Sequence, residues 1–442
     1  MARRDGTPPP LAGLGRAPET RYTPPEKPVG QKVGRVFRPS AKNATAWFHS
    51  HAPTSAHAPM NELTTRALLP AGLRDALPAE AEQEAEIVWR IAQVFASYGY
   101  RRVKPPMVEF EDSLLAGSQA ALARQTFRLM DPDSQRMLAL RADMTPQVAR
   151  IAATRLKGET RPLRLCYAGQ VMRVKGDALR PERQFGQVGA ELIGASEAQA
   201  DSEIVTMAAD ALTQVGATNI SIDLAIPYLV SAVLAAHPDP GPVAKEAIRT
   251  ALEKRDGETL ARVGREAGAV LAKLVAASGP VEKALPALKA LALPDAAKLE
   301  IARLEQAVGL IRAARPDLAL TVDAVERRGF EYQQGLSFTV FARGVRGELG
   351  RGGRYLAGED LMEGAGETAT GVTLFTDTVL RALPFPPPRK CVFVPVDAPA
   401  GTETALRQQG EIALRGFAAG ADAKSLGCTH VWRAGAVVKI EG

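Results

Sequence analysis

The chain has 442 residues, of which 46% are hydrophobic and 24% charged, so it is long enough and apolar enough to bury a large core. Its net charge of +6 lies within residues 1–59, which hold nine Lys and Arg against three Asp and Glu, whereas residues 60–442 hold 46 of each. A generally basic body of the kind that binds nucleic acid is therefore excluded, and any such binding would need a local patch.

Residues 1–59 contain ten prolines and show no sustained hydrophobic periodicity. Such a segment buries too little apolar surface to offset the entropy lost on ordering, so we expect a disordered, Pro-rich basic leader. The scattered arginines weakly resemble a transit peptide, but the prolines oppose the amphipathic helix that targeting needs. Translation from an upstream start, with Met60 as the usual first residue, is the preferred interpretation.

Residues 60–385 mix helical and extended patterns. Ile87, Ile91 and Phe95 recur at helical spacing after Ala79, and Gly99 offers a stop, which predicts a helix packed on a sheet. Two β-rich runs around residues 131–134 predict a hairpin. The further predictions are a helix at 197–215 and strands at 163–168, 187–193, 220–224, 338–341 and 371–375. This order favours an α+β fold with an antiparallel sheet over a doubly wound one.

Three later segments have a different character. Residues 229–318 are rich in Ala, Leu, Lys and Glu, with prolines between helical stretches, which predicts an inserted helical subdomain. Residues 386–442 follow a proline-rich run and predict a short C-terminal α/β unit, with a strand at 391–396, a helix near 403–418 and a final strand near 429–432. The glycine-rich run 350–355 fits no phosphate-binding motif, so we interpret it as a close backbone approach beside a pocket.

Polar residues with complementary chemistry gather between residues 140 and 191 and again near residue 328. The set comprises Asp143, Thr145, Arg173, Gln187, Glu191 and Arg328. Carboxylates and a hydroxyl suit an ammonium group and arginines suit a carboxylate, so the set predicts a pocket for a small zwitterion. The alternative is that Arg173, Gln187 and Glu191 are strand residues that satisfy one another, and that Arg328 forms a surface pair with Glu331.

Four motifs in chain order carry a resemblance to a known family. They are residues 69–78 (LPAGLRDALP), 140–146 (LRADMTP), 183–191 (RQFGQVGAE) and 328–332 (RGFEY). Over about residues 66–385 they resemble the class II histidyl-tRNA synthetases, and more closely the synthetase-like regulatory subunits of ATP phosphoribosyltransferase. The resemblance implies an antiparallel sheet flanked by helices and a class II-like self-dimer.

The resemblance also implies an amino-acid side of the site. The loop with Asp143 and Thr145 corresponds to the one that binds the histidine ammonium group, assisted by the residue at Gln187. Glu191 corresponds to the residue that faces the imidazole. At a second imidazole-facing position the synthetases have a tyrosine and this chain has Gln333.

The nucleotide side departs from the synthetase pattern. Arg173 keeps the motif 2 arginine, and Arg328 with Tyr332 corresponds to a pocket wall beside the substrate carboxylate. A motif 2 glutamate and two triphosphate-facing arginines are replaced by Lys175, Pro181 and Thr378. Phosphoryl chemistry depends on preorganised positive charge, so adenylate formation at a useful rate is not expected.

The leading hypothesis is a non-catalytic regulatory subunit that acts with a short-form ATP phosphoribosyltransferase catalytic subunit in the first step of L-histidine biosynthesis. It would transmit feedback by L-histidine within a hetero-oligomer. An active histidyl-tRNA synthetase and a stand-alone amino-acid sensor are the alternatives. The unit after residue 390 has neither a basic stripe nor interleaved aromatic residues, so tRNA binding is not expected.

The cysteines and the apolar runs bear on location and cofactors. Cys166, Cys391 and Cys428 are far apart in sequence, so neither a disulfide framework nor a zinc site is indicated, and no cofactor is implied. No run of 18 apolar residues occurs and the N-terminus lacks a secretory core, so we expect no membrane span and a cytoplasmic protein.

Overall fold

The computed structural model describes residues 68–115, 122–176, 179–326, 333–359, 366–387 and 389–441. The predicted leader and two predicted site residues, Arg328 and Tyr332, lie outside these described residues. Within them, no helix is both long enough and apolar enough to cross a membrane.

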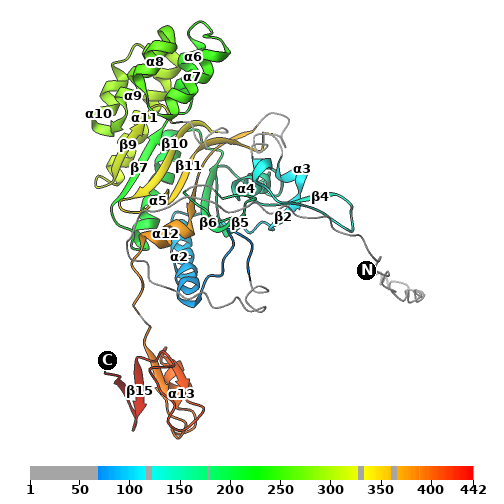
Figure 1. The fold of residues 1–442 in the computed structure, drawn as a ribbon, viewed down its shortest axis with the longest axis vertical. Helices are drawn as coiled ribbons and strands as arrows, with labels where there is room; N and C mark the ends of the chain where they lie inside the picture. Colours follow the sequence, from blue (N-terminus) through cyan, green and yellow to red (C-terminus); the bar gives the residue numbers. More distant parts are fainter. Residues whose placement is uncertain are drawn as a thin grey trace, which may run out of the picture. The chain divides into compact units, whose positions relative to one another are not determined.

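A nine-stranded sheet forms the centre of the fold (Figure 1). Neighbouring strands are antiparallel except in the β1/β5 and β7/β9 pairs, which confirms the predicted α+β fold with a mainly antiparallel sheet. In sheet order the strands are β1 (Arg101–Arg102), β5 (Leu163–Met172), β6 (Gln184–Ile193), β12 (Glu367–Phe375), β11 (Gly350–Ala357), β10 (Gln333–Ala342), β7 (Ile220–Ala225), β9 (Ala319–Asp323) and β8 (Gly279–Pro280).

Different helices cover the two faces of this sheet. The helices are α2 (Pro78–Ser97), α4 (Thr145–Thr154), α5 (Ala198–Gln214) and α12 (Thr376–Ala382). α2 and α5 share one buried cluster with the sheet, and the predicted stripe of α2, Ile87, Ile91 and Phe95, is buried there. α4 contributes to a second cluster on the other face with Tyr167 and Tyr355. Because successive strand residues point to opposite faces, one strand can serve both clusters.

A small three-stranded sheet positions the loop that carries Asp143. Its order is β2-β4-β3, with β2 (Val108–Phe110), β3 (Arg128–Met130), β4 (Met137–Leu140) and the adjoining α3 (Glu111–Leu114). β3 and β4 form the predicted hairpin, and in its turn Ser134 donates a hydrogen bond to Asp131. After β4, buried Arg141 donates to the carbonyl oxygens of Gln170 at 2.7 Å and Pro105 at 3.1 Å, which fixes the start of the loop.

Six helices lie between β7 and β9 and are grouped together in Figure 1. They are α6 (Tyr228–Ala235), α7 (Pro242–Glu253), α8 (Gly257–Val263), α9 (Arg265–Ala277), α10 (Val281–Lys289) and α11 (Asp295–Ala314). Leu271, Leu304 and Ile311 belong to the same buried cluster as Leu224 and Phe338 of the sheet. The helices therefore share a continuous core with the sheet, and the insertion boundaries remain a prediction.

The C-terminal segment folds around its own four-stranded sheet. The sheet order is β14-β13-β15-β16, with β13 (Cys391–Val394), β14 (Ile412–Arg415), β15 (His430–Arg433) and β16 (Ala436–Lys439), and one helix, α13 (Thr402–Gln408), connects β13 to β14. The predicted helix near 403–418 is wrong in its second half. Gly410, at a φ of 84°, follows the helix, and Ala413 is buried between exposed Ile412 and Leu414, the alternation of a strand. β16 also follows the strand predicted to be the last.

The glycine-rich run 350–355 lies in a central strand, β11, which was not among the predicted strands. The close approach that the glycines indicated occurs inside the sheet. A Cβ atom on Gly352 would lie 2.4 Å from the ring of Phe338 and 2.2 Å from the carbonyl oxygen of Gly371. Glycine is needed here because neighbouring strands fill the space that a side chain would occupy.

Candidate functional site

The structure brings four predicted site residues together on the sheet face that α4 covers. Asp143 and Thr145 come from the loop and first turn of α4, and Gln187 and Glu191 come from β6. Gln333 begins β10, but its side chain lies outside the described part of the structure, as Arg328 and Tyr332 do entirely.

Gln187 holds the Asp143 loop against β6. Its side-chain oxygen accepts from the backbone N–H of Met144 at 3.0 Å, and its nitrogen donates to Asp143 Oδ2 at 3.3 Å. Asp143 Oδ1 accepts from the backbone N–H of Thr145 at 3.0 Å. Gln187 is fully buried, so this clamp fixes where the Asp143 carboxylate stands.

Glu191 is almost fully buried, at 1% exposure. Its Oε1 accepts from Thr145 Oγ1 at 2.9 Å and from the Tyr167 hydroxyl at 3.2 Å, and its Oε2 accepts from the Tyr355 hydroxyl at 2.9 Å. Burial raises the pKa of Glu191 to about 8, in spite of the hydrogen bonds from Thr145 and Tyr355. At pH 7 the neutral carboxyl group therefore predominates, and a cationic ligand would favour the carboxylate.

Sequence reasoning did not identify Tyr167 and Tyr355, although glycines in the motifs make room for this arrangement. Gly189 lies opposite Tyr167 in the β5/β6 register, and a Cβ atom there would lie 2.3 Å from the Tyr167 hydroxyl oxygen. A Cβ atom on Gly371 would lie 1.8 Å from Glu191 Oε2. The only sequence signal for this arrangement is a glycine opposite a tyrosine, and that pairing is visible only once the strand register is known.

Arg173 lies just after β5 and is partly exposed at the edge of the cluster. Its Nε donates to the carbonyl oxygen of Ala142 at 3.4 Å, and its guanidinium lies 5.0 Å from the ring centre of Phe185. Arg173 therefore contacts the same loop that carries Asp143.

The nucleotide side predicted from the resemblance contains a buried ion pair. Arg180, which precedes Pro181, donates to Asp377 Oδ2 at 3.2 Å and to Thr378 Oγ1 at 3.2 Å. Its guanidinium also lies 3.9 Å from the ring centre of Phe375. Arg180 is 6% exposed, and its charge is matched inside the protein.

This geometry separates the two sides chemically. The Asp143 and Glu191 carboxyl groups, with hydroxyls around them, can receive an ammonium group or a ring N–H. The Arg180 guanidinium, paired with Asp377 and packed on aromatic rings, is not free to neutralise phosphate oxygens. The alternative interpretation was that polar strand residues satisfy one another. In its favour, Gln187 and Glu191 hydrogen-bond to neighbouring side chains in this structure.

Comparison with known proteins agrees with the motif order. A family model described as histidyl-tRNA synthetase matches residues 72–379. ATP phosphoribosyltransferase regulatory subunits from Rhodospirillum centenum and Paramagnetospirillum magneticum are each 53% identical, covering 85% and 86% of this chain and 97% and 100% of those proteins. A crystal structure of an ATP phosphoribosyltransferase regulatory subunit/histidyl-tRNA synthetase from Bacillus halodurans has the same fold, with a TM-score of 0.71 at 23% identity over 81% of this chain and 95% of that one. The chain therefore belongs to the ATP phosphoribosyltransferase regulatory subunit family, whose fold is that of the histidyl-tRNA synthetases.

Proposed function

We propose that this chain has no transfer or adenylation activity of its own and that a short ATP phosphoribosyltransferase catalytic subunit requires it for the first step of L-histidine biosynthesis. The regulatory name of its relatives supports the role. The observation that carries the non-catalytic part is the buried Arg180–Asp377 pair at the nucleotide side.

A triphosphate bound at that side would have to break this pair. Asp377 would then keep only Arg381 at 3.5 Å as a cationic partner, and it would lie buried beside further negative charge, which is unfavourable. Lys175, Pro181 and Thr378 stand where the resemblance implies an acid and two arginines, so no replacement set of cations is expected there. Amino-acid activation needs those cations in place before reaction, so the site suits binding without turnover.

We also propose that L-histidine binds the Asp143 and Glu191 cluster and acts there as the feedback effector. The ammonium group would bind Asp143 and Thr145, the imidazole would face Glu191, and Arg173 would lie near the carboxylate. Glu191 would gain a hydrogen-bond donor for its ionised form. Histidine would favour an inactive state of the complex if it binds that state more tightly.

Several finer points of this function remain predictions. They are the roles of Arg328, Tyr332 and Gln333, a class II-like self-dimer, the absence of tRNA binding and a cytoplasmic location. The domain division is also a prediction: a leader at 1–59, a synthetase-like domain at 60–385 and a C-terminal unit at 386–442.

Two measurements on the purified full chain test the proposal. Histidine-dependent exchange of pyrophosphate into ATP should stay at background, and appreciable exchange would make the chain an active synthetase. Histidine binding, measured by calorimetry, should weaken at least tenfold in Glu191→Gln. Glu203→Gln is the matched control, because Glu203 bonds to Tyr100 and Arg164, and among the described residues no hydrogen bond or ion pair joins it to the Asp143 cluster. Equal weakening in both variants would place histidine elsewhere.

A further inference from the structure

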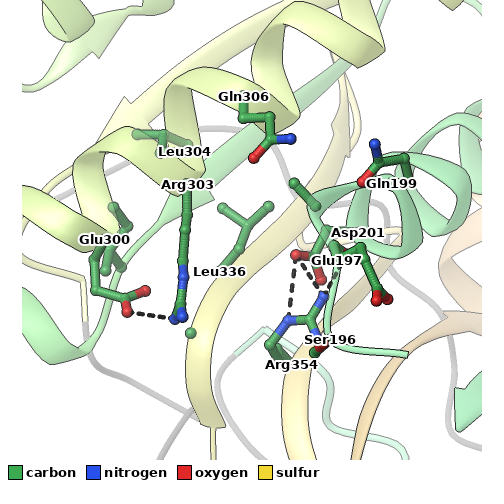
Figure 2. Close-up of a pocket in the computed structure, with 13 residues that line it drawn as sticks. Ser196, Glu197, Gln199, Asp201, Glu300, Arg303, Leu304, Gln306, Leu336 and Arg354 are labelled. Atoms are coloured by element: carbon green, nitrogen blue, oxygen red, sulfur yellow. Dashed lines mark hydrogen bonds and ion pairs between the residues drawn. The ribbon is translucent and has the colours of Figure 1, made fainter. Parts of the chain in front are cut away.

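A second cavity lies where helix α11 faces the first turn of α5, next to strands β10 and β11 (Figure 2). Its volume is about 350 Å³, at the lower end of the range for small-molecule sites. Leu304, Ile226 and Leu336 give it an apolar lining, and polar groups from α5, α11 and β11 complete the wall.

A buried ion pair forms the rigid part of this wall. Arg354 on β11 donates to Asp201 Oδ2 on α5 at 2.8 Å from Nη2 and at 3.3 Å from Nε. The same guanidinium donates to the carbonyl oxygens of Ala195 at 2.8 Å and Glu197 at 3.0 Å. Arg354 and Asp201 are 8% and 7% exposed. These contacts fix the start of α5, which keeps the cavity open at a defined shape.

The cavity and the Glu191 cluster lie on opposite faces of the same sheet. Arg354 and Tyr355 are consecutive on β11, so their side chains point to opposite faces. Arg354 binds Asp201 beside the cavity, whereas Tyr355 donates to Glu191 in the other cluster. β11 therefore contributes one side chain to each of the two sites.

The polar groups that reach the cavity include both signs of charge. Arg303 on α11 donates to Glu300 at 2.8 Å, and its side chain is 58% exposed, so the guanidinium remains accessible. Figure 2 shows Gln306 projecting from α11 on the side that faces Gln199 of α5. The N-terminus of α5 also lines the cavity, and its N-cap residue, Glu197, makes no side-chain capping hydrogen bond. The partial positive charge at the start of this 17-residue helix favours an anionic group.

We propose that this cavity is a second binding site that takes a small α-amino acid. Its carboxylate would bind Arg303 and the N-terminus of α5, and its ammonium group would bind Glu300, which now pairs with Arg303. The Gln199 and Gln306 amides can donate and accept, so they would meet a polar side chain. The proposal does not rest on the proposed function, because it concerns binding to this chain alone.

The test uses the full-length chain and calorimetric titration with L-histidine, L-glutamine and L-glutamate. At least one of these probes should bind, and Arg303→Met should weaken that binding at least tenfold, because a charged hydrogen-bond donor is lost. Lys298→Met is the matched control, since Lys298 forms a similar exposed pair with Asp295 on the same helix but does not line the cavity. Its binding should equal that of the unmodified chain.

Glu191→Gln separates the two sites. Binding at the second cavity should persist in Glu191→Gln and fall in Arg303→Met. The proposal is overturned if none of the three probes binds at millimolar concentration, or if Arg303→Met binds as tightly as the control. Loss in Glu191→Gln with no loss in Arg303→Met would assign the binding to the histidine-like cluster alone. None of these results depends on a catalytic subunit, so the proposed function can survive the failure of this site.

Discussion

Ionisation of Glu191 should make the protein less stable as the pH rises. The pKa of this carboxyl group rises from 4.5 to about 8 on folding because burial disfavours its charge. Between these values the folded chain keeps a proton that the unfolded chain has lost, so the free energy of unfolding falls with increasing pH. Each pKa unit corresponds to about 1.4 kcal/mol, so between pH 5 and pH 8 this group removes roughly 3 to 4 kcal/mol of stability.

The assay compares urea unfolding of the unmodified chain and Glu191→Gln across this pH range. The variant cannot ionise, so its stability relative to the unmodified chain should increase by the amount just given and level off above pH 8. Glu203→Gln is a control of opposite sign. Burial raises the pKa of Glu203, but its bonds to Arg164 and Tyr100 outweigh burial and leave the pKa lowered. That variant should lose relative stability as the pH rises to the unfolded pKa of 4.5, and its difference from the unmodified chain should stay constant between pH 5 and pH 8. A pH-independent difference for Glu191→Gln would refute the reasoning.

Three further changes follow from particular contacts. Arg180→Met should destabilise the chain by at most about 3–5 kcal/mol in urea unfolding, because it leaves the buried Asp377 carboxylate with only the longer pair to Arg381 at 3.5 Å, and a loss near zero would contradict a buried pair. Gly371→Ala should destabilise by more than about 2 kcal/mol, since its Cβ overlaps the Glu191 carboxylate, whereas Gly309→Ala on the exposed side of α11 should be neutral or stabilising. Cys391 and Cys428, whose Sγ atoms lie 3.1 Å apart, should form a linked peptide after diamide oxidation, faster at high pH because burial raises the pKa of Cys428 to about 12. Separate peptides at all pH values would count against that contact.

The elements that sequence could predict are those with a strong local pattern. The α2 stripe, the hairpin around residues 131–134 and the strand with Glu191 each carry a period or a turn signal that survives in the structure. β11 was not predicted as a strand because glycines dominate it, and only its neighbours, Phe338 and Gly371, explain them. The stretch after Gly410 was predicted wrongly because residues 411–415, EIALR, are compatible with a helix until their pairing with β13 is known.

The candidate site was likewise predictable only in part. Motif order indicated that Asp143, Thr145, Gln187 and Glu191 belong together, and the structure joins them by hydrogen bonds, although their ligand remains a proposal. Arg180 was not identified, because its neighbour Pro181 occupies the motif position and its ion-pair partner, Asp377, is 197 residues away in sequence. Long-range pairs of this kind have no local signature.

The most direct test of the regulatory role measures phosphoribosyl-ATP formation from ATP and phosphoribosyl pyrophosphate by a short catalytic subunit while this chain is added in increasing amounts. We predict a rate that rises to a plateau at a fixed ratio of the two chains, with no product from this chain alone, and a fall in the plateau when L-histidine is added. A catalytic rate that does not change with the amount of this chain would contradict the account.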